Sequence, residues 1–437
     1  MKKSLLQFLF IVSMSGIAFA QTVKIDSLDL KQAVNLTLQN QPLILQVEQE
    51  MKAVEAGIKE QKTSYLPVVD AEGSYTFLAP ISKMAFGGET FDLFPASNYN
   101  INVGARYKIY DFGKRDADLL VKESYKLTTE EKQNQIKSDL SYAVIQLFYK
   151  VLFLQKSITV KDDQIAILKK HIDDTEKRVE TGSATDFDIL TTKVRVSNLE
   201  SQKIDIQDEI RKAKIALCRL MGVEYSPDIK ITGKVNYTTI NVSADSLIAE
   251  AYVNRPEIKA ANDTKHTLEL KKDAVSYEEK PVLNALATFG FKNGLFPNMD
   301  VLRGNWVLGV NASIPIFDGN KKEIHNELAE TQIKETDFQI ESLKRKIRAE
   351  VQTAVSELKT AEEKIQTTQL NIDQAEQALE RAQLRYDSGV ATNIDVLDAE
   401  SQLSSAKLEN LRVVFRNILS LYSLKQSVGE NIWEEIQ

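Results

Sequence analysis

The sequence predicts an α+β membrane protein in which one unit, a pair of strands followed by a long helical hairpin, occurs twice. Three observations predict it: an internal repeat, two very long windows without glycine or proline, and four short segments of alternating apolar and polar residues. An internal repeat is considered first because it constrains the whole architecture. Two equivalent copies also indicate that function lies in features shared by both.

The repeat has one spacing throughout. Three motifs recur, each 207 residues after its first occurrence: YDFGKR from Tyr110 with FDGNKK from Phe317, RVETGSATDFDIL from Arg178 with RYDSGVATNIDVL from Arg385, and LMGVE around Gly222 with SVGEN around Gly429. In the middle pair, six of the thirteen residues are identical. The predicted organisation is a signal (1–20), a first repeat (21–222), a linker (223–243), a second repeat (244–429) and a C-terminal tail (430–437).

The first twenty residues are typical of an export signal. Lys2 and Lys3 form a charged end, an apolar stretch follows, and Ala18-Phe19-Ala20 is a small-x-small cleavage site. Gln21, rather than cysteine, follows the expected cut, which argues against a lipid-anchored N-terminus. The mature chain is therefore expected to be exported.

Composition limits the possible functions. The net charge of −7 argues against nucleic acid as a partner, because nucleic-acid binding favours a basic face. Beyond the signal no run of eighteen apolar residues predicts a membrane helix, so membrane contact would have to be made by strands. The single cysteine, Cys218, permits no disulfide framework, and its apolar neighbours predict a buried thiol.

The windows without glycine or proline predict helices over about 114–180 and 320–387. At 1.5 Å per residue each would be a rod of roughly 100 Å, whereas ordinary helices average about 11–12 residues. Apolar residues recur three or four positions apart in both, which is typical of a coiled-coil seam. These positions are Ile136, Leu140, Val144, Leu147, Val151, Leu154, Ile158, Ile165 and Leu168, then Ile340, Leu343, Ile347, Val351, Val355, Leu358 and Ile365. Return helices over about 186–221 and 393–428 complete two antiparallel hairpins, for which an exported coiled-coil scaffold without a pore remains an alternative.

Strands are predicted over about 68–78, 98–110, 282–292 and 305–317. Each has one apolar and one polar face and about the ten residues that cross a bilayer as a tilted strand. An amphipathic hairpin on a soluble core is the alternative. Four strands cannot close a barrel, since the smallest bacterial barrels use about eight, and unpaired edges are not tolerated in lipid. The chain is therefore expected to oligomerise, two copies giving eight strands and three giving twelve.

These features together resemble the TolC-type outer-membrane efflux family (outer membrane factors), over nearly the whole chain after the signal. The resemblance is carried by the DFGK and FDGN turns, the tips TGSATDFDIL and SGVATNIDVLDAE, and the paired helices near Pro42 and Pro256. It implies a homotrimeric α/β barrel with a shared 12-stranded barrel and a periplasmic tunnel of twelve helices. The linker 223–243 would then lie in an equatorial belt around that tunnel.

The resemblance also implies a function and partners. The chain would be the outer-membrane exit duct of a tripartite efflux pump, or alternatively of a type I protein secretion system. Its expected partners are two further copies of itself, outer-membrane lipid, a periplasmic adaptor (membrane fusion) protein and an inner-membrane transporter of RND, ABC or MFS type. The segments 86–97 and 296–304 are expected to face outside.

The sequence predicts neither an enzyme nor a cofactor or metal site. It has no Walker loop and no setting for a serine or cysteine nucleophile. The three histidines, His171, His266 and His325, lie apart on charged helical segments and are expected on the solvated surface.

The tips hold the candidate functional residues. The resemblance implies adaptor docking at Gly182, Ala184, Thr185, Gly389, Ala391 and Thr392; helix capping alone would also explain the glycines and threonines. It also implies a periplasmic gate formed by Asp395, Asp398, Asp188 and Tyr386, with carboxylates gathered around a threefold axis. Thr185–Asp188 and Thr392–Asp395 also read as capping boxes. Asp398 has no such role, which makes it the strongest gate candidate.

Two features of the gate stay open in the sequence. Ala391 stands where the family has an arginine that latches the closed tip, so the latch is expected to differ, with Arg178 and Arg385 as nearby cations. A constitutively open porin is a further possibility, in which conductance would be indifferent to charge removal at Asp395 and Asp398.

Overall fold

The structure, a computed structural model, describes residues 27–237 and 243–435. The predicted export signal and part of the predicted linker lie outside the described residues. The chain divides into two compact units, each of which takes segments from both sequence repeats. The first, here called the tip unit, comprises Met1–Asn40, Val144–Val235 and Ala375–Leu411; the second, the sheet unit, comprises Gln41–Ala143, Asn236–Gln374 and Arg412–Gln437.

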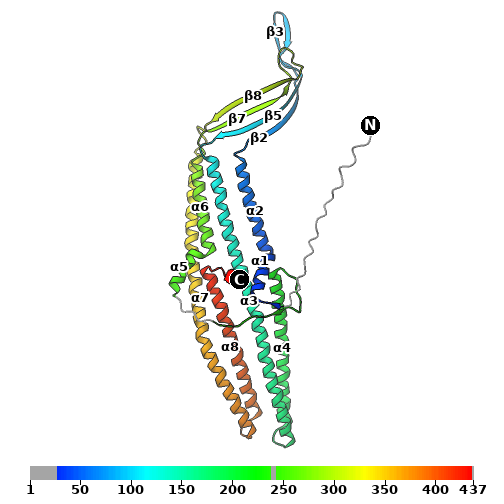
Figure 1. Ribbon diagram of the computed structural model, residues 1–437, viewed down its shortest axis with the longest axis vertical. Helices are drawn as coiled ribbons and strands as arrows, with labels where there is room; N and C mark the ends of the chain where they lie inside the picture. Colours follow the sequence, from blue (N-terminus) through cyan, green and yellow to red (C-terminus); the bar gives the residue numbers. More distant parts are fainter. Residues whose placement is uncertain (1–26, 238–242, 436–437) are drawn as a thin grey trace, which may run out of the picture. The chain divides into compact units, whose positions relative to one another are not determined.

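Four helices form two hairpins of equal dimensions (Figure 1). Helices α3 (Lys114–Glu180) and α7 (Lys321–Asp387) have 67 residues each, and the return helices α4 (Asp186–Met221) and α8 (Asn393–Val428) have 36 each. The absence of glycine and proline allows this length, and the predicted stripes supply the packing: six of the seven stripe residues in α7 are buried, Leu343 being half-buried. All four helices start and end within one residue of their predicted boundaries.

Helix α3 also contains an 18-residue stretch apolar enough by hydropathy to cross a membrane, with a mean hydropathy of 1.3. Such a composition does not by itself separate a membrane helix from a core helix. In the protein 39% of the stretch is buried, and Val144, Phe148 and Val151 of α3 are at most 1% exposed.

The four predicted strands form one antiparallel sheet. It consists of β2 (Val68–Phe77), β5 (Ser97–Tyr110), β7 (Val282–Lys292) and β8 (Arg303–Ser313), in the order β2-β5-β7-β8. The register pairs apolar residues with apolar residues: Ala71 with Val103, Ile101 with Phe291, and Phe289 with Trp306. One face of the sheet is therefore continuously apolar, and it is exposed in the single chain, Trp306 to 70%.

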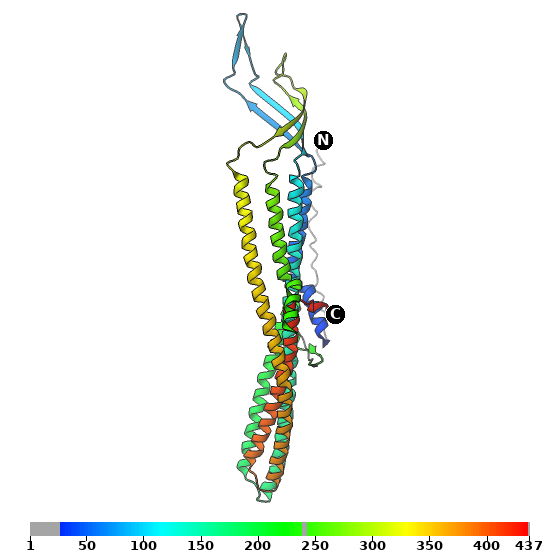
Figure 2. The same cartoon turned by 90° about the vertical axis from the view of Figure 1, so that its left-hand side faces the viewer.

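Two details of the sheet differ from the prediction. Strand β8 ends at Ser313 instead of near 317, because Pro315 has no backbone N–H for the ladder. A short hairpin, β3 (Lys83–Phe86) with β4 (Glu89–Asp92), was not predicted; Figure 2 shows it continuing away from the sheet. Its turn is Gly87-Gly88, with φ of 64° and 89°, the left-handed conformation that a two-residue hairpin turn needs.

Two helix pairs lie beside the hairpins, and each breaks at a proline. They are α1 (Leu30–Asn40) with α2 (Pro42–Thr63) and α5 (Ala244–Asn254) with α6 (Pro256–Val275). Proline disfavours helical backbone at the preceding residue, so Gln41 and Arg255 are extended. Apolar residues of α5, α6, α7 and α8 form a core of the sheet unit: Ile248, Ala251, Ile258, Ile347, Val351, Ala354, Val355, Leu358, Leu424 and Val428.

Each return helix ends against one of these breaks. Gly222, at the end of α4, lies against Asn40, so that an added Cβ would come within 3.0 Å of the Asn40 carbonyl oxygen. Gly429, after α8, lies against the equivalent corner, where an added Cβ would come within 2.8 Å of the Arg255 nitrogen. The two repeats thus use the same close glycine packing.

The remaining short elements lie outside the hairpins. Strand β1 (Ser27–Leu28) pairs in parallel with β6 (Lys230–Ile231) within the predicted linker, and a short helix α9 (Ile432–Glu435) occupies the predicted tail. Cys218 is 2% exposed, as its apolar neighbours predicted, and burial raises the pKa of its thiol.

Candidate functional site: the seam between the hairpin tips

Both tips turn in the same way. Gly182 and Gly389 have φ of 72° and 71°, and each ends a long helix with paired backbone hydrogen bonds. The N–H of Gly182 donates to the Val179 oxygen (3.0 Å), and the N–H of Gly389 donates to the Tyr386 oxygen (3.0 Å). This is the helix ending that glycine favours. A Cβ added at either glycine would meet nothing within 4 Å, so both loops present open surface.

The return helices start with capping boxes, as the sequence predicted. An Asp188 oxygen accepts from the Thr185 N–H at 3.0 Å, and the Thr185 hydroxyl oxygen accepts from the Asp188 N–H at 3.3 Å. Thr392 and Asp395 repeat the arrangement at 2.7 and 3.4 Å. Hydrogen bonds from the Thr392 backbone and hydroxyl hold the pKa of Asp395 below its usual range. Asp188 and Asp395 therefore serve the helix starts.

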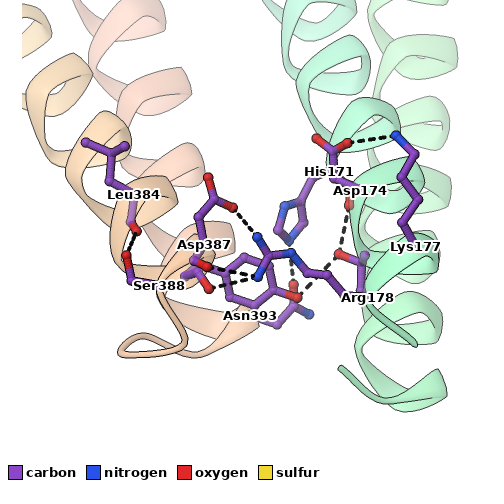
Figure 3. Close-up of polar contacts among 10 residues, drawn as sticks. His171, Asp174, Lys177, Arg178, Leu384, Asp387, Ser388 and Asn393 are labelled. Atoms are coloured by element: carbon purple, nitrogen blue, oxygen red, sulfur yellow. Dashed lines mark hydrogen bonds and ion pairs between the residues drawn. The ribbon is translucent and has the colours of Figure 1, made fainter. Parts of the chain in front are cut away.

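The two tips are joined by Arg178 of α3 (Figure 3). Its Nη2 donates to Asp387 Oδ1 at 2.6 Å, and its Nη1 donates to the Tyr386 carbonyl oxygen at 3.1 Å. The guanidinium carbon lies 4.9 Å from the centre of the Tyr386 ring, a cation–π geometry. Of the two cations that the sequence offers near the tips, Arg178 is the one that contacts the other hairpin through Tyr386 and Asp387.

Behind Arg178 lies a buried polar pair. His171 Nε2 is 2.7 Å from Asn393 Oδ1, and the Asn393 amide donates to the Asp188 carbonyl oxygen at 3.1 Å. The His171 ring also lies 5.1 Å from the ring of Tyr386, which is itself buried. His171 is only 8% exposed. The expectation of a solvated His171 was therefore wrong: its charged sequence neighbours face water, while it faces α8.

A second buried contact lies two turns further from the tip. Glu400 of α8 is 2% exposed and accepts from Gln164 Nε2 at 2.7 Å. Gln164 Oε1 accepts in turn from the Ser404 hydroxyl at 2.8 Å. Burial raises the pKa of Glu400. The hydrogen bond from Gln164 and the positive charge of Lys161 both lower this pKa, but their effect is smaller than that of burial. Apolar residues fill the space between these polar contacts: Ile165, Leu168, Ile172, Val196, Leu199 and Leu397, with Ile189.

The structure thus brings Tyr386 into the seam and leaves the other predicted gate residues at its surface. Asp398 pairs with Arg195 of α4 at 3.1 Å, and both side chains remain substantially exposed. The docking residues Gly182, Thr185, Gly389 and Thr392 are exposed, with Ala184 and Ala391 half-buried.

Four residues of the seam were not predicted as site residues from the sequence: Gln164, His171, Asn393 and Glu400. A signal for them exists in the helical periodicity. Gln164 and His171 are seven residues apart in α3, at positions that flank the buried Ile165, Leu168 and Ile172. Polar residues at such positions indicate specific polar contacts in a helical seam.

Comparisons with known proteins agree with this fold. Solved structures of CusC (18% identical, TM-score 0.75, covering 92% of both chains) and of the Vibrio cholerae outer membrane protein VceC (20% identical, TM-score 0.72, covering 92% of this chain and 96% of that one) share it. Outer membrane protein TolC of Vibrio cholerae is 20% identical over 407 residues, covering 92% of this chain and 90% of the relative. Cobalt-zinc-cadmium resistance protein CzcC of Cupriavidus metallidurans is 21% identical over 321 residues, covering 72% and 74%.

A family model settles the assignment. The model of the outer membrane efflux proteins matches residues 33–223 and, separately, residues 247–430, which together make up well over half of the chain. The two matched segments correspond to the two sequence repeats. The chain therefore belongs to the outer membrane efflux protein family and is an outer-membrane channel for efflux.

Proposed function

We propose that this channel is a homotrimer that serves as the exit duct of a tripartite efflux pump, with a periplasmic adaptor and an inner-membrane transporter as partners. The observation that carries the proposal is the sheet. Its apolar face is exposed, and β2 and β8 each have one edge with no partner strand in the described chain. Such edges are not tolerated in lipid, and three copies would join them into twelve strands.

The native mass of the protein tests this proposal. The protein would be extracted from an outer-membrane fraction in mild detergent and its mass measured after subtraction of the detergent. Three protomers are expected. A monomeric or dimeric mass, or recovery in the soluble fraction, would contradict the shared barrel and favour a scaffold without a pore.

For the adaptor, we propose docking on the two tip loops, at Gly182, Ala184 and Thr185 and at Gly389, Ala391 and Thr392. Support comes from their open glycines and from exposed apolar neighbours, Val390 (67%) and Ile394 (59%). Ala391→Trp should lower efflux from cells while the native mass is unchanged. Ala56→Trp, on the exposed surface of α2, is the control and should leave efflux as it was.

For the gate, we propose that Asp398 supplies charge at the periplasmic entrance, reduced by its pairing with Arg195. Removing the cation should strengthen the local negative potential, because Arg195 is the nearest opposite charge. In planar bilayers, Arg195→Gln is expected to increase cation selectivity and Asp398→Asn to decrease it, measured by reversal potentials at low salt. Identical reversal potentials in both variants would place Asp398 away from the ion path.

A further inference from the structure

Two cations lie directly opposite each other at one end of the sheet. Lys292 is the last residue of β7, Arg303 is the first residue of β8, and the strand register pairs them. The Cβ atoms of opposed residues lie about 4.5–5.5 Å apart, and like charges at that distance destabilise a sheet. The Arg303 Nη1 donates to the neutral Phe296 carbonyl oxygen at 3.0 Å, but neither cation forms an ion pair within the described part of the chain.

The other two cations of the four-stranded sheet do have acidic partners. The Arg106 guanidinium lies 3.2 Å from the Asp70 carboxylate, and the Lys108 ammonium lies 4.0 Å from the Asp111 carboxylate. The sheet therefore compensates its positive charge near the helices and leaves it uncompensated at the opposite end. Because opposed like charges are unfavourable, an anion held between them would stabilise the Lys292–Arg303 pair.

The pair lies on the polar face of the sheet. Phe291 belongs to the exposed apolar face, and a Cβ added at its register partner Gly304 would lie 3.7 Å from the Phe291 ring, on the same face. Successive residues of a strand point to opposite faces, so Lys292 and Arg303 lie on the other one. In the proposed channel the apolar face meets lipid, and the face with the two cations lines the pore.

The pair also lies at the end of the sheet away from the long helices (Figure 1). Helix α3 begins at Lys114, shortly after β5 ends at Tyr110, and α7 begins at Lys321, after β8 ends at Ser313. The pair is instead joined by the loop 293–302. In the proposed duct the long helices occupy the periplasm, so this end of the sheet is external. Three copies would bring three such pairs to the external mouth of one pore.

We propose that the Lys292–Arg303 pair is an anion-binding site at the external mouth of the pore. Its ligand is a soluble molecule that carries several phosphate or carboxylate groups. The inference rests on the homotrimer and the lipid-facing sheet of the proposed function, and it goes beyond that function by assigning a ligand class to the exit of the duct.

The side chains of the site suit such a ligand. The guanidinium of Arg303 is a planar fork that donates two parallel hydrogen bonds to phosphate or carboxylate oxygens. Lys292 adds an ammonium group with three donors, and Asn100, its register partner on β5, adds amide N–H donors. A multivalent anion held there would narrow the mouth and neutralise its positive charge. Its binding should therefore reduce the conductance of the pore.

Conductance in planar bilayers of a zwitterionic lipid tests the site, with sodium tripolyphosphate as the anion. Because the long helices stay on the side to which the protein is added, the opposite side is external. The full chain would be compared with a double variant, Lys292→Gln with Arg303→Gln, and with each single change. The matched control is Lys83→Gln, which also removes one positive charge but on the β3–β4 hairpin, where Lys83 lies 3.7 Å from Asp92.

External tripolyphosphate is expected to block the unmodified channel at low salt. The double variant should need a concentration about tenfold higher or more, because clustered like charges concentrate counter-ions by at least that factor. Lys83→Gln should behave like the unmodified protein. If the native mass is that of three protomers, the anion site is overturned by unchanged block in the double variant, by an equal loss in Lys83→Gln, or by block from the periplasmic side alone. A monomeric native mass would overturn both the site and the duct.

Two further variants of Lys292 separate the site from a general loss of structure. Lys292→Glu places opposite charges at the paired positions, which favours the sheet. Its trimer should therefore assemble as well as that of the unmodified protein, measured by native mass, while the block by tripolyphosphate is lost. Lys292→Arg keeps both cations and should keep the block. An equal loss of block in Lys292→Arg and Lys292→Glu would overturn the charge-based site.

Discussion

At the scale of single residues, the tip unit depends on buried polar side chains that contact one another between the two hairpins. Glu400 is the clearest example, because its carboxyl is almost wholly buried and its pKa is raised from the ordinary 4.5. A carboxyl with a raised pKa holds its proton more tightly in the folded protein than in the unfolded chain. The contribution of Glu400 to the stability of the folded state is therefore fully present at low pH and is lost as pH rises from about 4.5 through the folded pKa.

Glu400→Gln should remove this pH dependence. Glutamine can still accept from Gln164 through its amide oxygen, but it carries no charge. The melting temperature of the variant, followed by helical circular dichroism, is expected to exceed that of the unmodified protein by more at pH 8 than at pH 5. Glu376→Gln, at an exposed ion pair with Lys407, is the control and should show little change at either pH. If the melting temperature of Glu400→Gln differs from that of the unmodified protein by the same amount at pH 5 and at pH 8, the charge of Glu400 is not the cause of the pH dependence.

Asn393→Ala should destabilise the tip unit by about 1–3 kcal/mol, because it leaves the Nε2 atom of buried His171 without its partner. The repeat offers a matched control, Asp186→Ala, at the equivalent and exposed position of α4. That change should stay within about 0.5 kcal/mol. Denaturant unfolding monitored at the tips would measure both, and equal losses would mean that the buried contact contributes nothing specific.

At the scale of elements, glycines decide where helices end and what they can touch. Gly222, Gly429 and Gly182 all have positive φ, but the first two also lie against another backbone. Gly182→Ala should cost about 1 kcal/mol for its left-handed conformation alone. Gly222→Ala and Gly429→Ala should cost clearly more, since the added Cβ would overlap Asn40 or Arg255. Melting temperatures of the three variants would rank them, and the same loss at all three would remove the packing argument.

The sequence predicts these elements well where the determining information is local. Windows without glycine or proline predict α3 and α7, and the alternation of apolar and polar residues predicts β2, β5 and β7. Pro315 is a local signal for the end of β8, and Gly87-Gly88 is a local signal for the β3–β4 hairpin, but neither feature was predicted. The contact between His171 and Asn393 was beyond local reasoning, because it joins residues 222 positions apart and depends on how two hairpins pack.

At the scale of the whole molecule, the exposed apolar face of the sheet determines where the protein can be stable. Val310 and Asn311 are neighbours on β8 that face opposite sides, and both are exposed. Val310→Arg should cost up to about 2–4 kcal/mol if its face meets lipid, and Asn311→Arg should cost little. The assembled protein recovered from the outer-membrane fraction would be compared between the two variants. Equal recovery would contradict a lipid-facing apolar surface.

The spacing of the two buried polar contacts restricts how this protein can change length. Gln164 and His171 are seven residues apart on α3, and their partners Glu400 and Asn393 are seven apart on α8. Removing a few residues from α3 or α8 between these two contacts would therefore shift one helix along the other, so that both facing pairs could no longer meet. Insertions or deletions between the two contacts should therefore be accepted only when α3 and α8 change together, so that the facing pairs are restored. Relatives of different length, and any chimaera of them, should differ in this region by matched segments of α3 and α8.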